Sequence, residues 1–361
     1  MNFIDRYLPP SRFNSVLKSL PKQFELSEIG KSVLNQPIYG IKIGSGKTKI
    51  LMWSQMHGNE STTTKVIYDL ILSLSDSDSS ISVEGLTLYI IPQLNPDGAE
   101  AYTRLNANAV DLNRDALDLS QPESKVLRKV FEDFKPDFCF NLHGQRTIFS
   151  AGKKGKSATV SFLAPAADSE SSVTSARKEA MLVIAAMNNQ LQQSIPDQIG
   201  RFDDTFNHNC VGDYFSCKGV PTILFEAGHY SNDYNRNITR KFVLDALECA
   251  FDVIQNKIHL GYSVSDYIKI PQNHQDYVDI LCKNVTIKYG TKVFYNQEMA
   301  VQFIEKLEGD KIKFHLSFHS FGDRIELLAH KTIDFEGSSR PLLFHFAQGE
   351  NVDNEMFLGF Y

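Results

Sequence analysis

Short, mostly apolar runs recur through the first two thirds of the chain. Each is four to six residues long and is bounded by polar or turn-forming residues. Runs of this length are typical of strands that are buried on both faces of a sheet. We predict such strands at residues 50–54, 86–91, 138–142, 160–164 and 222–225.

Between these runs, apolar residues repeat with the 3.6-residue period of a helix. The repeat covers residues 66–74, 126–134, 173–193 and 238–254. Strands that alternate with helices are typical of α/β domains, in which helices cover a central sheet. We therefore predict an α/β fold, a three-layer sandwich with a mixed, mostly parallel central sheet.

The pattern changes after about residue 262. Turn-forming glycines at positions 290, 309 and 322 separate short strand-like segments, and no long helical pattern follows. The predicted strands lie at residues 286–287, 292–295, 311–318 and 324–329. We predict two domains, a catalytic α/β domain over residues 1–262 and a small β-rich domain over residues 263–361.

The first 24 residues contain Pro9, Pro10 and Pro21. Because proline in a helix interior removes a hydrogen bond and clashes with the preceding turn, we expect these prolines to interrupt any helix here. The segment is predicted to cap the α/β domain.

Composition narrows the class of protein. The 361 residues are 42% hydrophobic and 22% charged, which is ordinary for a globular protein. A net charge of −6 without a basic tail argues against nucleic acid and anionic membranes as partners. No apolar stretch approaches the ~18 residues of a membrane span, and no signal-peptide pattern begins the chain. Five scattered cysteines indicate reduced thiols, so we expect a cytoplasmic protein.

His57-Gly-Asn-Glu60 is the most informative short motif. It follows the predicted strand at 50–54 and precedes the helical pattern at 66–74. A histidine and a carboxylate three residues apart at such a turn can both point at one metal ion. Zinc is the ion that this pair favours, because catalytic zinc takes three protein ligands and leaves a position open for water.

Three later segments add candidate chemistry. The first is Asn95-Pro-Asp-Gly98, followed by Arg104 and by Asp111-Leu-Asn-Arg114. The second and third are apolar runs that end on one polar residue each, His143 and Glu226. Each segment alone is a loose motif, whereas six motifs in this order are highly specific.

Taken together, these motifs resemble those of the zinc metallocarboxypeptidases of the carboxypeptidase A type, over about residues 25–255. The resemblance implies that His57, Glu60 and His143 bind Zn²⁺. It also implies that Glu226 is the general base that activates a zinc-bound water, and that Arg104 polarises the scissile carbonyl and stabilises the oxyanion.

The same resemblance assigns the substrate's carboxylate to Asn113 and Arg114, whose planar guanidinium can meet both oxygens at once. Asp111 matches a carboxylate that orients the first zinc histidine. The implied function is hydrolysis of the C-terminal peptide bond, and the implied partner is a peptide or acyl-amino-acid substrate with a free carboxylate.

The sequence departs from the family pattern in several places, the first of which is a tyrosine. The family carries a mobile tyrosine about twenty residues before the catalytic glutamate, and residues 201–212 contain no tyrosine. Phe202, Phe206, His208, Tyr214 and Tyr230 are candidates to fill the space, and the role stays unassigned. Gly212 is expected near the floor of the pocket that reads the terminal side chain, which leaves side-chain preference open.

Two other functions stay open. The first is a zinc-dependent N-acyl amino acid hydrolase of the succinylglutamate desuccinylase or aspartoacylase type, which shares most of the motifs and also carries a β-rich C-terminal region. Asn95-Pro-Asp-Gly98 favours the peptidase. The second is a non-catalytic relative that binds peptide without cleaving it.

One cluster in the predicted C-terminal domain has two interpretations. Strand alternation places His315, Ser317 and His319 on one face. This face is either a second metal site or a polar solvent face, and we favour the solvent face.

Overall fold

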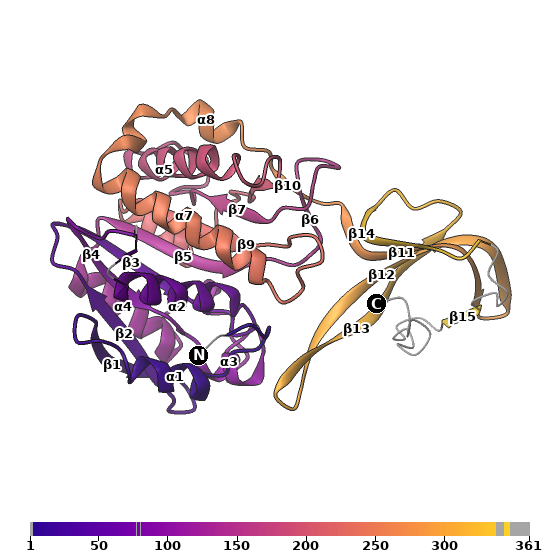
Figure 1. The fold of residues 1–361 in the computed structure, drawn as a ribbon, viewed down its shortest axis with the longest axis horizontal. Helices are drawn as coiled ribbons and strands as arrows, with labels where there is room; N and C mark the ends of the chain where they lie inside the picture. The colour runs from indigo at the N-terminus through magenta and orange to yellow at the C-terminus, as the bar shows by residue number, and fades with distance from the viewer. Residues whose placement is uncertain (1–2, 77, 80, 337–342, 347–361) are drawn as a thin grey trace.

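The computed structural model describes residues 3–76, 78–79, 81–336 and 343–346. Figure 1 shows two parts, a large body in which helices surround a sheet and a smaller, elongated C-terminal sheet. The α/β class and the additional β-rich sheet predicted from the sequence are confirmed. The predicted domain boundary at residues 262/263 stays a prediction, and residues 337–342 and 347–361 of the second predicted domain lie outside the described residues.

The central sheet has eight strands in the order β1-β2-β4-β3-β5-β9-β7-β8. Its centre, β4-β3-β5-β9, is parallel, and β7 pairs with β8 in parallel, while β1-β2, β2-β4 and β7-β9 are antiparallel. The strands are β1 (Glu25–Lys31), β2 (Pro37–Ile43), β3 (Thr48–Ser54), β4 (Leu86–Ile91), β5 (Phe138–Gly144), β7 (Val160–Leu163), β8 (Ile199–Arg201) and β9 (Thr222–Ala227).

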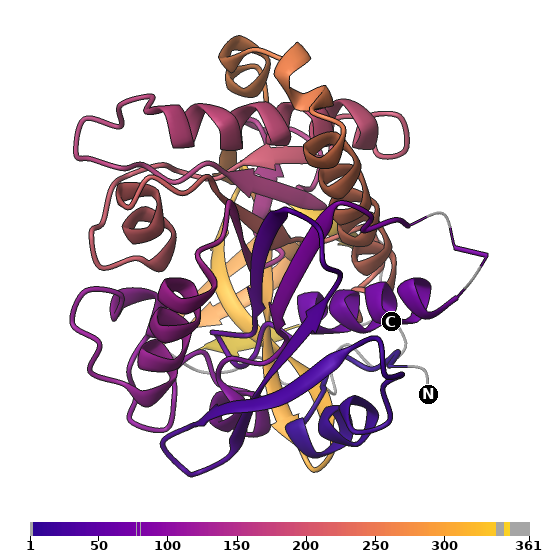
Figure 2. The same cartoon turned by 90° about the vertical axis from the view of Figure 1, so that its left-hand side faces the viewer.

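Helices cover both faces of this sheet, as Figure 2 shows. One apolar cluster joins the sheet to α2, α5 and α7, and a second joins the opposite face to α4 and α6. The helices are α1 (Pro10–Leu17), α2 (Thr62–Ser75), α3 (Pro96–Ala101), α4 (Pro122–Phe134), α5 (Ser175–Leu191), α6 (Val211–Cys217), α7 (Asn237–Gln255) and α8 (Val264–Ile268), with 3₁₀ turns η1 (Leu112–Arg114) and η2 (Ile258–Gly261). No helix in the described part of the chain is long and apolar enough to cross a membrane.

The N-terminal segment corrects one expectation. A helix, α1, begins at Pro10, which occupies the first helical position, and it buries Phe13 and Leu17. Proline is tolerated there because the first backbone N–H groups of a helix have no intrahelical partner. The strands β1 and β2 are also absent from the prediction. Strand β1 is an edge strand with mostly exposed residues, whereas β2 is mostly buried.

The C-terminal sheet has the order β13-β12-β11-β14, and β15 also pairs with β11. Its strands are β11 (Tyr277–Tyr289), β12 (Lys292–Glu308), β13 (Lys311–Gly322), β14 (Leu328–Asp334) and β15 (Leu343–Phe346), and a short pair of β6 (Phe149–Ala151) with β10 (Asn273–Gln275) precedes it. Most of these strands are much longer than predicted, and the strand expected at 324–329 begins only at Leu328. Gly290 and Gly309 have positive φ at the two hairpin turns, as predicted turn glycines should.

A buried histidine lies where the C-terminal sheet meets the α/β part. His229 is fully buried, and its ring centroid is 4.3 Å from that of His330 in β14. Among the described residues neither ring nitrogen of His229 has a hydrogen-bond partner. Burial, with the nearby charges of Arg236, His330 and Arg6, lowers the pKa of His229 well below its ordinary value.

This histidine should make stability depend on pH. Below the unfolded-state pKa of about 6.5, the unfolded chain binds a proton that the folded protein does not, so the free energy of unfolding falls as pH falls. His229→Phe keeps a ring of similar size. Between pH 6.5 and 5 the free energy of unfolding of this variant is expected to fall by up to about 2 kcal/mol less than that of the parent. Urea unfolding at both pH values measures this, with the exposed His274→Gln as control. An unchanged pH dependence in His229→Phe would contradict it.

Candidate metal centre and active-site cleft

Three neighbouring parallel strands bring the candidate residues together. His57 follows the end of β3, while His143 and Glu226 lie near the ends of β5 and β9 and are direct partners in the register. The carboxyl ends of parallel strands meet at one edge of a sheet, which is where α/β proteins place their sites. Residues far apart in the sequence are adjacent for this reason.

The two histidines and Glu60 form a compact cluster. Nδ1 of His57 lies 2.8 Å from Oε1 of Glu60, Nδ1 of His143 lies 2.9 Å from Oε2, and the two Nδ1 atoms are 3.1 Å apart. The backbone N–H of Gly144 donates to Oε2 of Glu60 at 2.9 Å. Among the described residues this is the one group of three or more His, Cys, Asp or Glu side chains placed to hold a metal ion. The alternation in β13 has therefore not produced a second such group there.

The donor set fits a metal ion. Nε2 of His57 lies 3.0 Å from Oδ1 of Asp111, so this nitrogen is assigned as the proton donor and Nδ1 presents its lone pair to Glu60 and His143. Lone pairs and carboxylate oxygens that face one another repel unless a positive charge lies between them. Two imidazole nitrogens and one carboxylate are ligands that zinc prefers, and they leave one tetrahedral position for water.

The pKa shifts of His57 and Glu60 also indicate that the cluster favours a positive charge. Burial alone would lower the pKa of His57, but Glu60 and Asp111 outweigh it and raise that pKa to about 9. Burial would likewise raise the pKa of Glu60, and the two histidines instead hold it well below its ordinary value. Both shifts thus reflect negative charge around the two histidines that a bound cation would balance.

Glu226 lies beside this cluster in a different electrostatic setting. It is 9% exposed, and its Oε2 is buried with no hydrogen-bond partner among the described residues. Burial, and then the charge of Glu60, raises its pKa well above the ordinary value. A buried carboxylate oxygen without a partner is costly, which marks this position as a candidate for chemistry rather than for packing.

Asp111 connects His57 to Arg104. Its Oδ2 accepts from Nε and Nη2 of Arg104 at 3.2 and 3.0 Å, while its Oδ1 faces His57. Burial would raise the pKa of Asp111, but the bond to His57 and the charges of His57 and Arg104 lower it. Arg104 is half-exposed, and its Nη1 lies 3.5 Å from Glu60 at the cleft.

Asn113 and Arg114 lie on η1, which Asp111 caps by accepting from the backbone N–H of Asn113 at 2.9 Å. The side-chain oxygen of Asn113 accepts from the N–H of Val211 at 3.1 Å. Nη1 of Arg114 contacts Sγ of Cys210 at 3.0 Å. These contacts join η1 to the start of α6.

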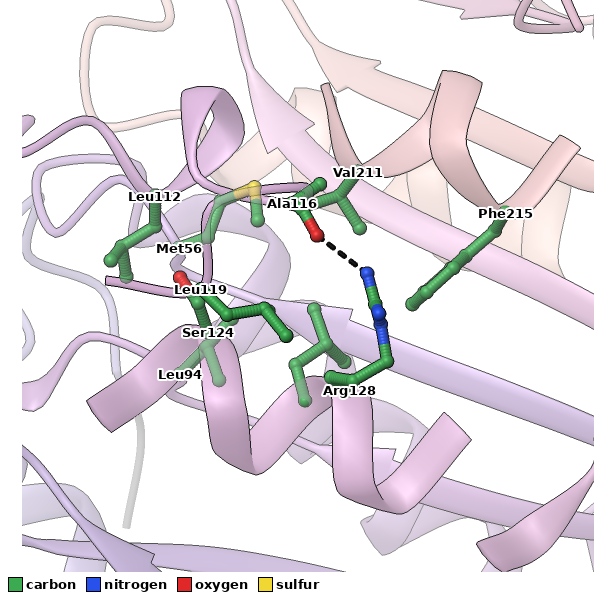
Figure 3. A pocket seen from close by; sticks show the side chains of 10 residues that line it. Met56, Leu94, Leu112, Ala116, Leu119, Ser124, Arg128, Val211 and Phe215 are labelled. Atoms are coloured by element: carbon green, nitrogen blue, oxygen red, sulfur yellow. Dashed lines mark hydrogen bonds between the residues drawn. The ribbon is translucent and has the colours of Figure 1, made fainter. Parts of the chain in front are cut away.

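Apolar packing supports this turn from behind. Figure 3 shows a small void under it, where Arg128 of α4 donates to the backbone oxygen of Ala116. The void measures about 10 Å³, which leaves room for one water molecule at most, so the turn rests on a filled core. Its walls are Met56, Leu94, Leu112, Ala116, Leu119, Ser124, Leu127, Arg128, Val211 and Phe215.

A cleft of about 650 Å³ contains all the candidate residues that should touch substrate or metal. Gly212 lines it, and a Cβ there would lie 2.9 Å from Cγ of Pro165, which agrees with a place at the pocket floor. Asp213 lies beside it, and burial raises its pKa to about 6. The lining includes His57, Glu60, Arg104, Asn113, Arg114, His143, Glu226, Gly212 and Asp213.

None of the tyrosine candidates named from the sequence lines this cleft. Tyr214 packs instead against Arg128, whose guanidinium lies 3.9 Å from its ring centroid, and Tyr230 packs on Phe242. Tyr234 does line the cleft, and its hydroxyl donates to Oδ1 of Asp279 at 3.0 Å. Phe202 is the candidate from the 201–212 segment that lines the cleft, so an aromatic ring without a hydroxyl lies there.

The sequence missed one side of the cleft. Phe303, Ile304, Glu305 and Phe314 of the C-terminal sheet line it, as does Arg6 from the N-terminal segment. Residues 303–305 lay beyond the strand predicted at 292–295, and Phe314 lay within the strand predicted at 311–318. No motif marked any of them, because their place at the cleft depends on how the C-terminal sheet packs.

Comparisons with known proteins agree with this geometry. A sequence model of the zinc carboxypeptidase family matches residues 12–239. Carboxypeptidase SOL1 of Arabidopsis thaliana is 32% identical over 148 residues, which cover 35% of this chain and 30% of that protein. Carboxypeptidase 2 of Trichophyton rubrum is 28% identical over 109 residues, 29% of this chain and 20% of that protein. The match thus spans less than a third of either relative's length.

Solved structures show the same fold. A carboxypeptidase A from Helicoverpa armigera superimposes with a TM-score of 0.55 at 16% identity, over 72% of this chain and 75% of that one. A metallo-carboxypeptidase from Burkholderia cenocepacia superimposes with a TM-score of 0.53 at 20% identity, over 69% and 71% of the two chains. At such identities the likeness concerns the fold.

Proposed function

This chain belongs to the zinc carboxypeptidase family, and from that premise we propose that it is a zinc metallocarboxypeptidase that removes C-terminal residues from peptides. One observation carries the proposal. The His57–Glu60–His143 cluster, the carboxyl of Glu226, whose Oε2 has no hydrogen-bond partner among the described residues, and the Asn113–Arg114 turn all open into one cleft.

His57, Glu60 and His143 would hold the zinc ion, with Asp111 keeping His57 in the tautomer that presents Nδ1. When bound, zinc polarises a carbonyl and lowers the pKa of water to about 7. Asp111 is itself held by Arg104, so the orientation of His57 depends on a fixed chain of contacts.

Glu226 would move the proton. Its carboxylate accepts a proton from the attacking water as the new C–O bond forms. It then donates that proton to the nitrogen of the leaving amine as the C–N bond breaks. The raised pKa of Glu226 suits both halves of this step, because a carboxyl that holds its proton more strongly is a better base and remains able to return it.

Arg104 would stabilise the charge that develops on the carbonyl oxygen. Its guanidinium lies at the edge of the cleft, with Nη1 toward Glu60 and its other nitrogens held by Asp111. A cationic donor that is already oriented lowers the barrier without reorganising during the reaction.

Asn113 and Arg114 would bind the substrate's terminal carboxylate. The contacts of Arg114 with Cys210 and with the backbone oxygen of Asn113 both use Nη1. Among the described residues, Nε and Nη2 have no hydrogen-bond partner. The guanidinium therefore keeps donors for a bidentate carboxylate. Such a clamp restricts cleavage to the end of a peptide.

The test is mass-spectrometric turnover of a mixed peptide library with zinc added, alongside N-acetyl- and N-succinyl-amino acids. We expect ladders shortened from the C-terminus, no cleavage of peptides that end in an amide, and loss of activity to background with a chelator. Activity should return when zinc is restored, because the three ligands are held in place by the protein.

The alternative, an N-acyl amino acid hydrolase, has one observation in its favour. The C-terminal sheet lines the cleft, which leaves less room for a long peptide. Release of acyl groups with peptides untouched would establish this alternative. Zinc binding without turnover of any substrate would instead favour the non-catalytic relative.

A further inference from the structure

The hairpin of β12 and β13 forms one side of the cleft. Figure 1 shows it as the long pair of strands that extends from the C-terminal sheet beside the α/β part. Phe303, Ile304 and Glu305 of β12 and Phe314 of β13 line the same cavity as the metal cluster. The cavity therefore has walls from elements that are separated by more than a hundred residues in the sequence.

An ion pair between buried Arg6 and half-buried Glu305 attaches the hairpin to the N-terminal segment. Nε and Nη2 of Arg6 donate to Glu305 at 3.0 and 3.2 Å, and Nη1 donates to Oγ1 of Thr62 at 2.8 Å. The hydroxyl of Tyr102 also donates to Glu305. Thr62 begins α2, two residues after Glu60, so the hairpin is tied to the element that carries a candidate metal ligand.

A buried carboxylate, that of Asp279, also holds the hairpin at Phe303. Asp279 of β11 is fully buried, and it accepts from the backbone N–H of Phe303 at 2.7 Å and from the hydroxyl of Tyr234 at 3.0 Å. Gln302 also donates to it. Because breaking buried, charge-assisted hydrogen bonds is costly, the hairpin is a fixed wall rather than a loose flap.

The wall presents aromatic surface to the cleft. The ring of Tyr234 lies 5.1 Å from that of Phe303 and 5.4 Å from that of Phe314, both edge-on, and the two phenylalanines are 5.8 Å apart. All three side chains are half-buried and line the cavity. Aromatic rings arranged in this way form a stable apolar surface for a ligand.

The wall and the carboxylate clamp are attached to different elements around the cleft. Asn113 and Arg114 contact Cys210 and Val211 at the start of α6, whereas Arg6 contacts Glu305 of β12 and Thr62 of α2. If the clamp binds the free carboxylate, the hairpin remains available to contact the part of the substrate before the scissile bond.

We infer that the β12–β13 hairpin is a specificity wall that favours substrates with a short acyl group before the scissile bond, such as a dipeptide or an acylated amino acid, over longer peptides. This inference rests on the proposed hydrolysis of carboxylate-terminated substrates. A cavity of about 650 Å³ is the size that encloses a small ligand, and the aromatic face favours an apolar acyl group.

The test compares kcat/KM for peptides that share their last two residues and are extended at the N-terminus from two to ten residues. We expect kcat/KM of the parent protein to fall with length by about tenfold or more, the scale of a few apolar contacts. Ile304→Ala and Phe314→Ala should each raise the ratio of the ten-residue to the two-residue value by about tenfold.

Lys306→Ala and Lys313→Ala are matched controls, since both lysines are exposed on the same two strands and neither lines the cleft. Ile304 is 41% exposed, so its truncation should leave the fold intact even if Phe314→Ala is destabilising. Equal kcat/KM for all lengths in the parent, or an unchanged ratio in both cleft variants, would overturn the wall.

A binding measurement separates this inference from the proposed function. In Glu226→Gln protein, a short N-acyl dipeptide should slow amide hydrogen exchange in residues 301–305, and a ten-residue peptide should slow it less. If no peptide or acyl amino acid is hydrolysed, the proposed function fails, and exchange still decides the wall. Slower exchange at residues 301–305 supports the specificity wall, and unchanged exchange there overturns it.

Discussion

Glu226→Gln is expected to lower kcat by about 10³-fold or more while leaving the zinc content unchanged. The amide has nearly the shape of the carboxyl but cannot accept the proton from water. Because Glu226 is not among the three residues that face one another in the metal cluster, zinc should remain bound. Steady-state kcat, measured with metal content on the same sample, tests both parts.

The exposed Glu100→Gln is the control for this result, since it makes the same chemical change outside the cleft. Retained zinc with activity within about tenfold of the parent would remove Glu226 from the role of base. Loss of zinc together with activity would instead show that Glu226 supports the metal cluster.

Arg114→Ala is expected to raise KM for substrates with a free carboxylate by about 10²-fold, with a much smaller effect on C-terminal amides. A bidentate charged hydrogen bond in a cleft contributes about 3 kcal/mol, and 1.4 kcal/mol corresponds to tenfold in affinity. Paired kinetics on matched acid and amide substrates measure the difference.

Arg114→Lys refines this test, because lysine keeps the charge but loses the planar fork. It should lie between the parent and Arg114→Ala for the acid substrates. Equal effects of Arg114→Ala on acids and amides would rule out the carboxylate clamp and assign Arg114 to the support of η1, where it contacts Cys210.

The sequence made the candidate site visible because its residues lie at the ends of strands. His143 and Glu226 each close an apolar run, and His57 and Glu60 follow another, so local patterns predicted both the strands and the polar residues at their ends. The order of the motifs then indicated the family, which is confirmed. The individual roles stay predictions that the variants above test.

Other features needed the three-dimensional arrangement. The resemblance assigned Asp111 to His57, but nothing in the sequence paired Asp111 with Arg104, which donates to its other carboxylate oxygen. Likewise, the sequence offered several candidates for the position of the family's mobile tyrosine and could not choose among them. Of these candidates Phe202 lines the cleft, and Tyr234, which was not among them, lines it too.

The sequence by itself determined the alternation of strands and helices, the turns at Gly290 and Gly309, and the set of polar residues for a metal centre. These follow from local periodicity and from backbone preferences, which act over a few residues. Only the tertiary structure decided that the β12–β13 hairpin walls the cleft. There Arg6 pairs with half-buried Glu305, 299 residues away in the sequence, and local sequence preferences do not act over such separations.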